Sequence, residues 1–245
     1  APVSELQEKY GSPNPKGLME YISTCKREFK PQTKFQYSCL NYITLQHIIE
    51  TITGQSLRDF AKENIFDILG MQYTDYLPTI QQQDGKWINT VACPWMDWIA
   101  PTEKQKDGSV LCGQVHDPLA RILNGGISGN AGIFSNANDI GILAAALLNG
   151  GEYNGRRILS PLGVKTMCTV PRELTAFGRT PGWDIFSPYA SNKGDLFSPN
   201  TFGHTGYTGT SIIIDPDNDT AVILLVNAVH PEDRHSIVRL RSLVA

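Results

Sequence analysis

Two apolar runs near the C-terminus constrain the fold more than any other feature of the 245-residue sequence. Residues 210–215 and 220–227 are rich in β-branched side chains, and an Asp-Pro-Asp-Asn-Asp segment at 215–219 separates them. β-Branched residues favour strands, whereas Pro, Asp and Asn favour a tight turn. The sequence therefore predicts a hairpin of two long, central strands.

Helices are predicted in the first two-thirds of the chain. Apolar residues recur on one helical face over residues 41–53, and Ser56 resembles the cap of a second helix that runs to Gly70. Ser135 or Asn138 could cap a helix over 140–148, and Pro161 suits the first turn of another. The last predicted helix spans residues 235–244.

Residues 71–123 lack this periodicity and carry three of the four tryptophans. Long irregular segments often line a site in compact domains. We therefore expect an α+β fold, an antiparallel sheet flanked by helices with a helical subdomain. The chain is expected to form a single domain over 1–245, mainly helical and irregular over about 1–180, with the sheet in 181–245.

Composition excludes several functional classes. Hydrophobic residues make up 41% and charged residues 18%, which is a globular balance. The net charge is −3, and the Lys and Arg residues form no basic stripe along the sequence. Nucleic acid is therefore not an expected partner. No apolar run is long enough to span a membrane, and the first residues lack the features of a signal peptide. The five cysteines have no zinc-ligand spacing and do not imply a framework of disulfides.

The segment 202–210, Phe-Gly-His-Thr-Gly-Tyr-Thr-Gly-Thr, is the sharpest candidate for chemistry. Glycines at the edge of a strand let a ligand approach the backbone, and His204 with nearby N–H groups could bind an oxyanion. An ordinary turn feeding an edge strand is the alternative. A second candidate is Tyr37, which precedes the first strong helix. A tyrosine there serves as a base only beside a cation, and otherwise packs.

Together these elements resemble a known family. Residues 37–71, YSCLNYITLQHIIETITGQSLRDFAKENIFDILGM, look like the second-motif helix pair of class C-type serine β-lactamases, penicillin-binding carboxypeptidases and esterases. Their Tyr-x-Asn motif falls on Tyr37, Ser38 and Cys39. Residues 202–216 look like the strand with their Lys-Thr-Gly motif, here His204, Thr205 and Gly206. The blocks 99–103, 113–121 and 125–135 match in order between them.

This resemblance implies an acyl-enzyme mechanism on a D-alanyl peptide, a β-lactam or an ester. In the family a serine of a Ser-x-x-Lys motif attacks a carbonyl, and the lysine and tyrosine move the proton. Tyr37 and His204 would be the catalytic residues of this chain. Thr205 and Gly206 would line the substrate cleft, and the N–H of Tyr207 would belong to the oxyanion hole. The resemblance also implies that the reaction needs neither a metal nor an organic cofactor. A periplasmic or extracellular location follows from the resemblance alone.

Two departures from the family pattern weigh against activity of this chain by itself. Cys39 replaces the motif's Asn and cannot donate an amide hydrogen bond to a substrate. The early Ser-x-x-Lys match, Ser23 with Lys26, lies too close to Tyr37 and is expected on a helix surface. We therefore expect an N-terminally truncated chain without its nucleophile. Strands lost beside 210–215 would expose a sheet edge, which predicts self-association or a compensating rearrangement.

Alternatives to a serine hydrolase remain open at this point. The same fold could serve as a non-catalytic ligand-binding or scaffold protein, as the replaced Asn suggests. A thiol enzyme that pairs Cys39 with His116 or His204 is a third hypothesis, although no feature of the sequence lowers the pKa of that thiol. His116 itself could line the site, or it could brace an irregular loop.

Overall fold

The computed structural model describes residues 2–187, 193–233 and 236–245, which form two compact units. Unit 1 comprises Ala1–Glu28, Ser38–Asn64 and Tyr73–Ser135. Unit 2 comprises Phe29–Tyr37, Ile65–Gln72 and Asn136–Ala245. The division expected near residue 180 stays a prediction.

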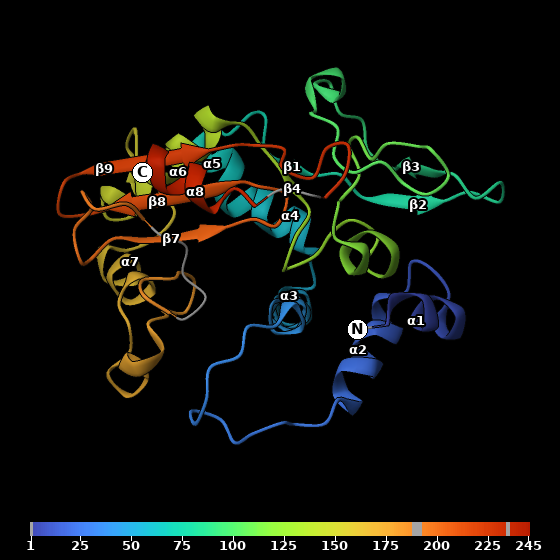
Figure 1. Cartoon of the computed structure of the whole chain (residues 1–245), viewed down its shortest axis with the longest axis horizontal. Helices are drawn as coiled ribbons and strands as arrows, with labels where there is room; N and C mark the ends of the chain where they lie inside the picture. The colour runs from blue at the N-terminus through green and yellow to red at the C-terminus, as the bar shows by residue number, and fades with distance from the viewer. Residues whose placement is uncertain (1, 188–192, 234–235) are drawn as a thin grey trace. The chain divides into compact units, whose positions relative to one another are not determined.

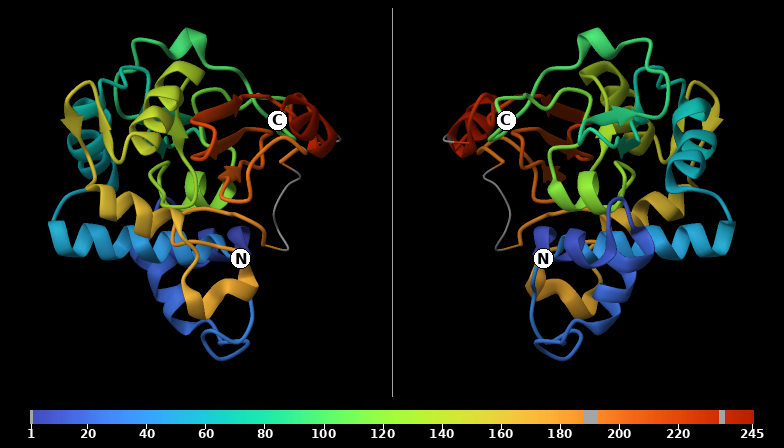
Figure 2. Two further views of the ribbon diagram at one scale, coloured as in Figure 1. Left: turned by 90° about the vertical axis from the view of Figure 1, so that its left-hand side faces the viewer. Right: turned by 90° about the vertical axis from the view of Figure 1, so that its right-hand side faces the viewer.

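Three helices of unit 1 pack around a small apolar core, which the turn at 119–123 completes. They are α1 (Val3–Tyr10), α2 (Pro15–Thr24) and α3 (Cys39–Thr53), and α4 (Leu57–Ala61) follows α3. The long helix α3 is seen lengthwise in Figure 2. It begins two residues before the predicted start, because the Ser38 hydroxyl caps it by accepting from the N–H of Leu40, and it ends at Gly54 as predicted. The buried core residues are Leu6, Leu18, Ile43, Leu119 and Leu123.

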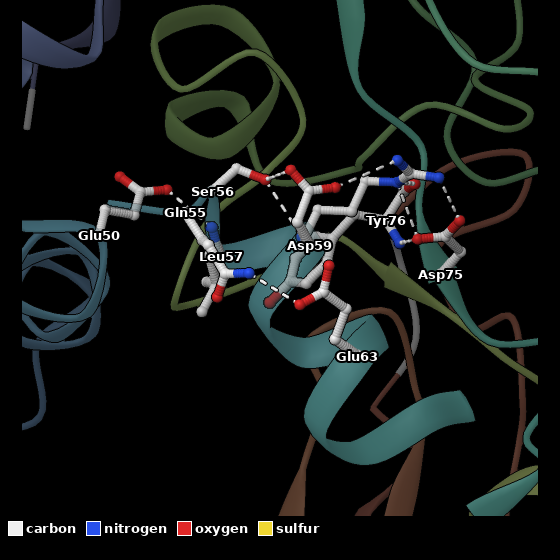
Figure 3. A network of polar contacts seen from close by, with 9 residues as sticks. Glu50, Gln55, Ser56, Leu57, Asp59, Glu63, Asp75 and Tyr76 are labelled. Carbon is white, nitrogen blue, oxygen red and sulfur yellow. Dashed lines mark hydrogen bonds and ion pairs between the residues drawn. The ribbon is translucent and has the colours of Figure 1, made fainter. Parts of the chain in front are cut away.

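Polar contacts fix the joint between α3 and α4 (Figure 3). Ser56 Oγ accepts from the N–H of Asp59 at 3.1 Å, which confirms the predicted cap. Glu50 accepts from the N–H of Leu57 at 3.0 Å, so α3 supplies a second acceptor to the start of α4. Arg58 forms a forked ion pair with Asp75, at 2.9 and 2.6 Å, and ties the helix to the irregular segment.

The predicted second helix is not continuous. After α4 the chain makes a π-helical turn, η1 (Lys62–Phe66), and then a short helix α5 (Asp67–Leu69) that ends at Gly70. The turn at η1 is also where the chain passes from unit 1 to unit 2. Its residues, Lys-Glu-Asn-Ile-Phe, are compatible with an ordinary α-helix, so the sequence did not reveal the wider turn.

The segment 71–123 is largely irregular, as predicted, but it contains short strands. β1 (Asp75–Tyr76) pairs with β4 (Ile133–Phe134), and β2 (Thr79–Gln81) pairs with β3 (Trp87–Asn89), both antiparallel. Single turns occur at η2 (Met96–Trp98) and η3 (Leu119–Leu123).

Unit 2 is built on a three-stranded antiparallel sheet, drawn in orange and red in Figure 1. β7 (Phe202–Thr205), β8 (Ser211–Asp215) and β9 (Thr220–Leu224) follow one another in space. The predicted hairpin is therefore confirmed, but its strands have only five residues each. Of the two, β8 is central as predicted, whereas β9 lies at the edge of the sheet among the described residues. The expectation of an open edge beside 210–215 is wrong, because β8 has a partner on each side.

Helices cover this sheet and complete unit 2. α6 (Ala137–Leu148) packs on β9 and is capped by Asn136, which lies between the two predicted caps. α7 (Pro161–Cys168) begins after Ser160 as predicted, and the turn η4 (Arg172–Phe177) follows it. α8 (Val238–Val244) begins later than the predicted 235, and His235 lies outside the described residues. A small hairpin joins β5 (Glu152–Tyr153) and β6 (Arg156–Arg157). The core comprises Ala144, Leu147, Val164, Phe202 and Ile214.

A buried carboxylate organises the turn between β8 and β9. Asp215 is fully buried and accepts hydrogen bonds from Ser198 Oγ at 2.6 Å, Asn218 Nδ2 at 2.7 Å and the N–H of Asp217 at 3.0 Å. The N–H of Ser198 is a fourth donor, at 2.9 Å. Burial raises the pKa of Asp215, but these donors outweigh burial and hold it well below the usual range.

We predict that Asp215→Ala lowers the free energy of unfolding by about 3 kcal/mol, because four donors lose one charged acceptor in a buried place. The measurement is urea denaturation followed by circular dichroism. Asp219→Asn is the matched control, since Asp219 is exposed with φ +48° and asparagine tolerates that conformation. A loss for Asp215→Ala no larger than the control's would contradict this role.

We also predict self-association through the outer edge of β9. Among the described residues this strand pairs with β8 alone, and an unpaired strand edge can bind another copy. Light scattering should give a mass above 27.0 kDa that rises with protein concentration. Thr220→Lys, at the exposed start of β9, should reduce it. A monomer at every concentration would contradict the prediction.

Candidate active site

His204 lies on β7, opposite Ile212 of β8, and is partly buried. Its Nδ1 is 2.9 Å from the carbonyl oxygen of Thr205. A carbonyl can only accept a hydrogen bond, so Nδ1 carries the proton. The other ring nitrogen, Nε2, therefore holds a lone pair whenever the ring is neutral.

The surroundings of His204 favour that neutral form. Burial is the main cause that lowers its pKa below the usual 6.5. The hydrogen bond to Thr205 opposes this shift, the charge of Arg179 adds to it, and the charge of Asp184 opposes it more weakly. His204 is accordingly an acceptor at neutral pH, whereas a lysine in the same place would be a cation.

Tyr37 and His204 lie side by side within unit 2. Their ring centroids are 6.1 Å apart, with the planes inclined at 44°. The guanidinium carbon of Arg179 lies 5.4 Å from the centroid of Tyr37 and 5.8 Å from that of Phe35. Both distances are typical of cation–π contacts. The structure thus brings the two predicted catalytic residues together and adds a cation that the sequence analysis did not identify.

Asp184 holds Arg179 in this place. Arg179 Nη1 donates to Asp184 Oδ2 at 3.1 Å, and the two side chains are only 11% and 10% exposed. The same carboxylate accepts from the N–H and the hydroxyl of Ser187. The backbone of Asp184 pairs in both directions with Gly203, at 2.9 and 3.0 Å. Residue 184 therefore extends the sheet beside β7, next to His204.

Hydrogen bonds from α8 and to Asp233 fix the loop that follows β7. Arg241 of α8 donates to the carbonyls of Gly206 at 2.8 Å and Thr210 at 3.1 Å. The phenol of Tyr207 donates to Asp233 at 2.5 Å, although 76% of this residue is exposed. These contacts position the backbone of the predicted Thr205, Gly206 and Tyr207 wall. Their roles in substrate binding stay predictions.

Two glycines that flank this wall are required, because other backbone atoms lie too close to leave room for a side chain. A Cβ on Gly203 would lie 2.4 Å from the carbonyl oxygen of Ile212 on the neighbouring strand. Gly209 has φ +120°, and a Cβ there would lie 2.6 Å from the carbonyl oxygen of Val226. Neither position accepts a side chain without a backbone shift.

Cys39 lies in unit 1, at the first position of α3. Burial is the main cause that raises its pKa, and the charge of Asp117 adds to it, whereas a hydrogen bond with Asn130 opposes the rise. A raised pKa keeps the sulfur protonated, which is the opposite of what a thiol nucleophile needs. The structure therefore disfavours the thiol-enzyme hypothesis.

Asn130 was missed in the sequence, although it lies within the block 125–135. A buried polar chain fixes its orientation. Gln46 Oε1 accepts from Asn124 at 2.8 Å, Asn124 donates to Ser128 Oγ at 2.9 Å, and Ser128 donates to Asn130 Oδ1 at 2.7 Å. The loop also packs closely on α3, because a Cβ on Gly129 would lie 2.1 Å from the carbonyl of Tyr42. The sequence of the 125–135 loop does not indicate these contacts, because they join it to residues far away along the chain.

His116 makes the contacts expected of a residue that braces a loop. Its Nε2 lies 3.2 Å from Glu103 Oε2. Its carbonyl accepts from the buried side chain of Arg121 at 2.9 Å, and that arginine also binds the carbonyl of Val115 at 2.6 Å. Burial lowers the pKa of Arg121. A role of His116 in lining a substrate site stays a prediction.

Ser23 and Lys26 lie on the exposed surface of unit 1. Ser23 occupies the last turn of α2, and its hydroxyl donates to the carbonyl of Glu20 at 2.7 Å. A nucleophilic serine needs a base within hydrogen-bond reach, and a backbone carbonyl is not one.

Across 2–187, 193–233 and 236–245, no group of three or more His, Cys, Asp or Glu side chains is arranged to hold a metal ion. Over the same ranges, the helices are too short or too polar to cross a bilayer.

The sequence model of the beta-lactamase family matches residues 3–245 of this chain. The chain belongs to that family. The match covers both units and includes Tyr37, the 125–135 block and the His204 strand, which are the elements that carried the resemblance.

Relatives and solved structures agree with this membership. A protein of Escherichia coli K12 named "Putative D-alanyl-D-alanine carboxypeptidase" is 35% identical over 226 residues, which are 86% of this chain and 49% of that protein. This chain thus spans about half the length of such relatives. A β-lactamase of Mycobacterium bovis matches with a TM-score of 0.58 at 17% identity, over 99% of this chain and 79% of its own. An octameric penicillin-binding protein homologue of Pyrococcus abyssi gives 0.56 at 20%, over 90% and 45%. The expected α+β fold of the β-lactamase and transpeptidase type is therefore confirmed.

We predict that iodoacetamide at pH 8 modifies the exposed Cys25 and Cys112 before Cys39, because burial and Asp117 disfavour the Cys39 thiolate. Peptide mass spectrometry over a time course measures the order. Cys168, whose pKa burial raises to about 11, is the internal reference for a slow thiol. Fastest modification at Cys39 would revive the thiol-enzyme hypothesis.

Proposed function

We propose that this chain contributes the Tyr37 and His204 walls of an acyl-transfer serine hydrolase, with a nucleophile that is neither Ser23 nor Cys39. The main support is the contact of Tyr37, His204 and Arg179 within one compact unit. Membership of the beta-lactamase family supplies the class of reaction. The substrate classes are a D-alanyl peptide, a β-lactam or an ester.

The reaction would proceed in two acyl transfers. A serine oxygen attacks the substrate carbonyl, its proton passes to Tyr37, and the leaving group departs with that proton. Water then attacks the acyl-enzyme, and Tyr37 accepts a proton from water and returns it to the serine. The N–H of Tyr207 would stabilise the oxyanion in both steps.

The charge of His204 affects which substrates the site would accept. A neutral imidazole offers a lone pair at Nε2, so it binds a donor and gives no charge attraction to a carboxylate. We therefore propose that acyl groups without a carboxylate beside the scissile bond react faster than β-lactams near neutral pH. The resemblance supports a periplasmic or extracellular location, which belongs to the same proposal.

A non-catalytic binding protein on this fold is the second candidate. The observation that favours it is Cys39, which stands where the family motif has an amide. Asn130 contacts Cys39 through a hydrogen bond and has a fixed amide orientation. An amide donor is therefore present in this part of unit 1, and the loss of Asn at position 39 does not by itself exclude turnover.

The test is covalent labelling of the intact protein that contains these 245 residues. We expect a fluorophosphonate probe to form an adduct, a fluorescent penicillin to react more slowly at pH 7.5, and Tyr37→Phe to reduce the labelling rate at least 100-fold, the usual contribution of general acid–base catalysis. Mass spectrometry of the labelled peptide identifies the nucleophile.

Ser23→Ala is the matched control and should label at the wild-type rate. Loss of labelling in Ser23→Ala would show that Ser23 is the nucleophile and overturn its exclusion. Absence of any adduct on a folded, intact protein would overturn the hydrolase proposal and leave the binding protein.

A further inference from the structure

Arg179 is a charged residue beside Tyr37 in unit 2, and the proposed reaction steps give it no role. Its guanidinium faces the rings of Tyr37 and Phe35, and its ion pair with Asp184 is almost completely buried. Burying such a pair costs desolvation energy and does not usually add stability compared with apolar residues of the same size. The pair therefore has an energetic cost of desolvation, and it lies beside Tyr37, which in turn contacts His204. Such a placement calls for a functional explanation.

We propose that Arg179 is a positioning residue that holds the Tyr37 ring against His204. The catalytic consequence rests on the proposed function, whereas the positioning does not. Arg179 does this from a fixed place, because Asp184 is anchored to β7 through its backbone and to Ser187 through its carboxylate.

The geometry of the guanidinium supports the positioning role. A planar cation can face the aromatic rings while one edge binds a carboxylate, which a lysine ammonium cannot reproduce. Phe35 and Tyr37 belong to the same extended segment, and both lie within cation–π range. Arg179 therefore contacts two side chains of the segment that carries Tyr37, and it fixes this segment as well as the Tyr37 ring.

The charges around His204 determine the direction of the electrostatic effect. Arg179 disfavours an imidazolium, Asp184 favours it, and the effect of Arg179 is the larger. Lys193 is bound to the carbonyls of Ile185 and Thr201 and lies near Asp184. Arg241 of α8 binds the backbone of the next loop. The ring of Tyr37 also lies beside the imidazole, with the two centroids 6.1 Å apart.

The experiment is an NMR titration of His204 in the 245-residue chain, assigned by the loss of one signal in His204→Gln. We expect the titration midpoint to rise in Arg179→Met and to fall in Asp184→Asn. The double variant, Arg179→Met with Asp184→Asn, should titrate between the two single variants, because two charges of opposite effect are removed together. It leaves no unpaired buried charge, so we expect it to fold even if a single variant fails to.

Arg179→Lys separates charge from geometry. We expect it to keep the midpoint near that of wild type and yet to change the ring-current shift of the His204 protons, because Tyr37 loses its planar partner. Arg157→Met removes an arginine from an exposed ion pair of the same unit and should change neither signal. In the intact protein, the acid limb of fluorophosphonate labelling should move in the same order as the midpoints.

The outcomes separate this inference from the proposed function. Equal midpoints in the double variant, Asp184→Asn and wild type would overturn the charge effect. An unchanged ring-current shift in Arg179→Lys would overturn the positioning role. Shifted midpoints in a protein that no probe labels would support the inference and reject the hydrolase proposal.

Discussion

Asp184 is the residue on which the arrangement of unit 2 depends most. Its backbone extends the sheet beside Gly203, while its carboxylate fixes Arg179 and through it the Tyr37 segment. Backbone pairing and side-chain pairing at one residue couple two segments that are distant in sequence. An aspartate can do both because its short side chain keeps the charge within reach of its own strand.

The local parts of this fold could be predicted from sequence, because each depends on neighbouring residues. The β8–β9 hairpin follows from β-branched runs around a Pro-Asp turn. The cap at Ser56 follows from a side chain that bonds to the next turn, and the start of α7 follows from Pro161 in its first turn. The π-helical turn at 62–66 could not be predicted in this way, since its residue types are compatible with an ordinary α-helix. The exact cap of α6 differed by one or two residues for a similar reason, because several neighbouring side chains could have capped it.

The candidate site was predictable only as far as its motifs. Tyr37 and His204 were identified from the order of blocks along the chain, and the structure places them side by side. Arg179 and Asn130 were missed, because their importance comes from contacts with residues far away in sequence. Asp184 was missed for the same reason. Such contacts are set by packing, which composition and periodicity do not record.

The two glycine positions without room for a Cβ limit which residues of this wall can be substituted. Gly203 and Gly209 have no room for a Cβ, so the backbone between them is an almost invariant frame. Variation is confined to the side chains that the frame displays, such as His204 and Tyr207. A directed-evolution library should therefore randomise the intervening positions and leave both glycines alone. Altered selectivity can then arise without loss of the fold.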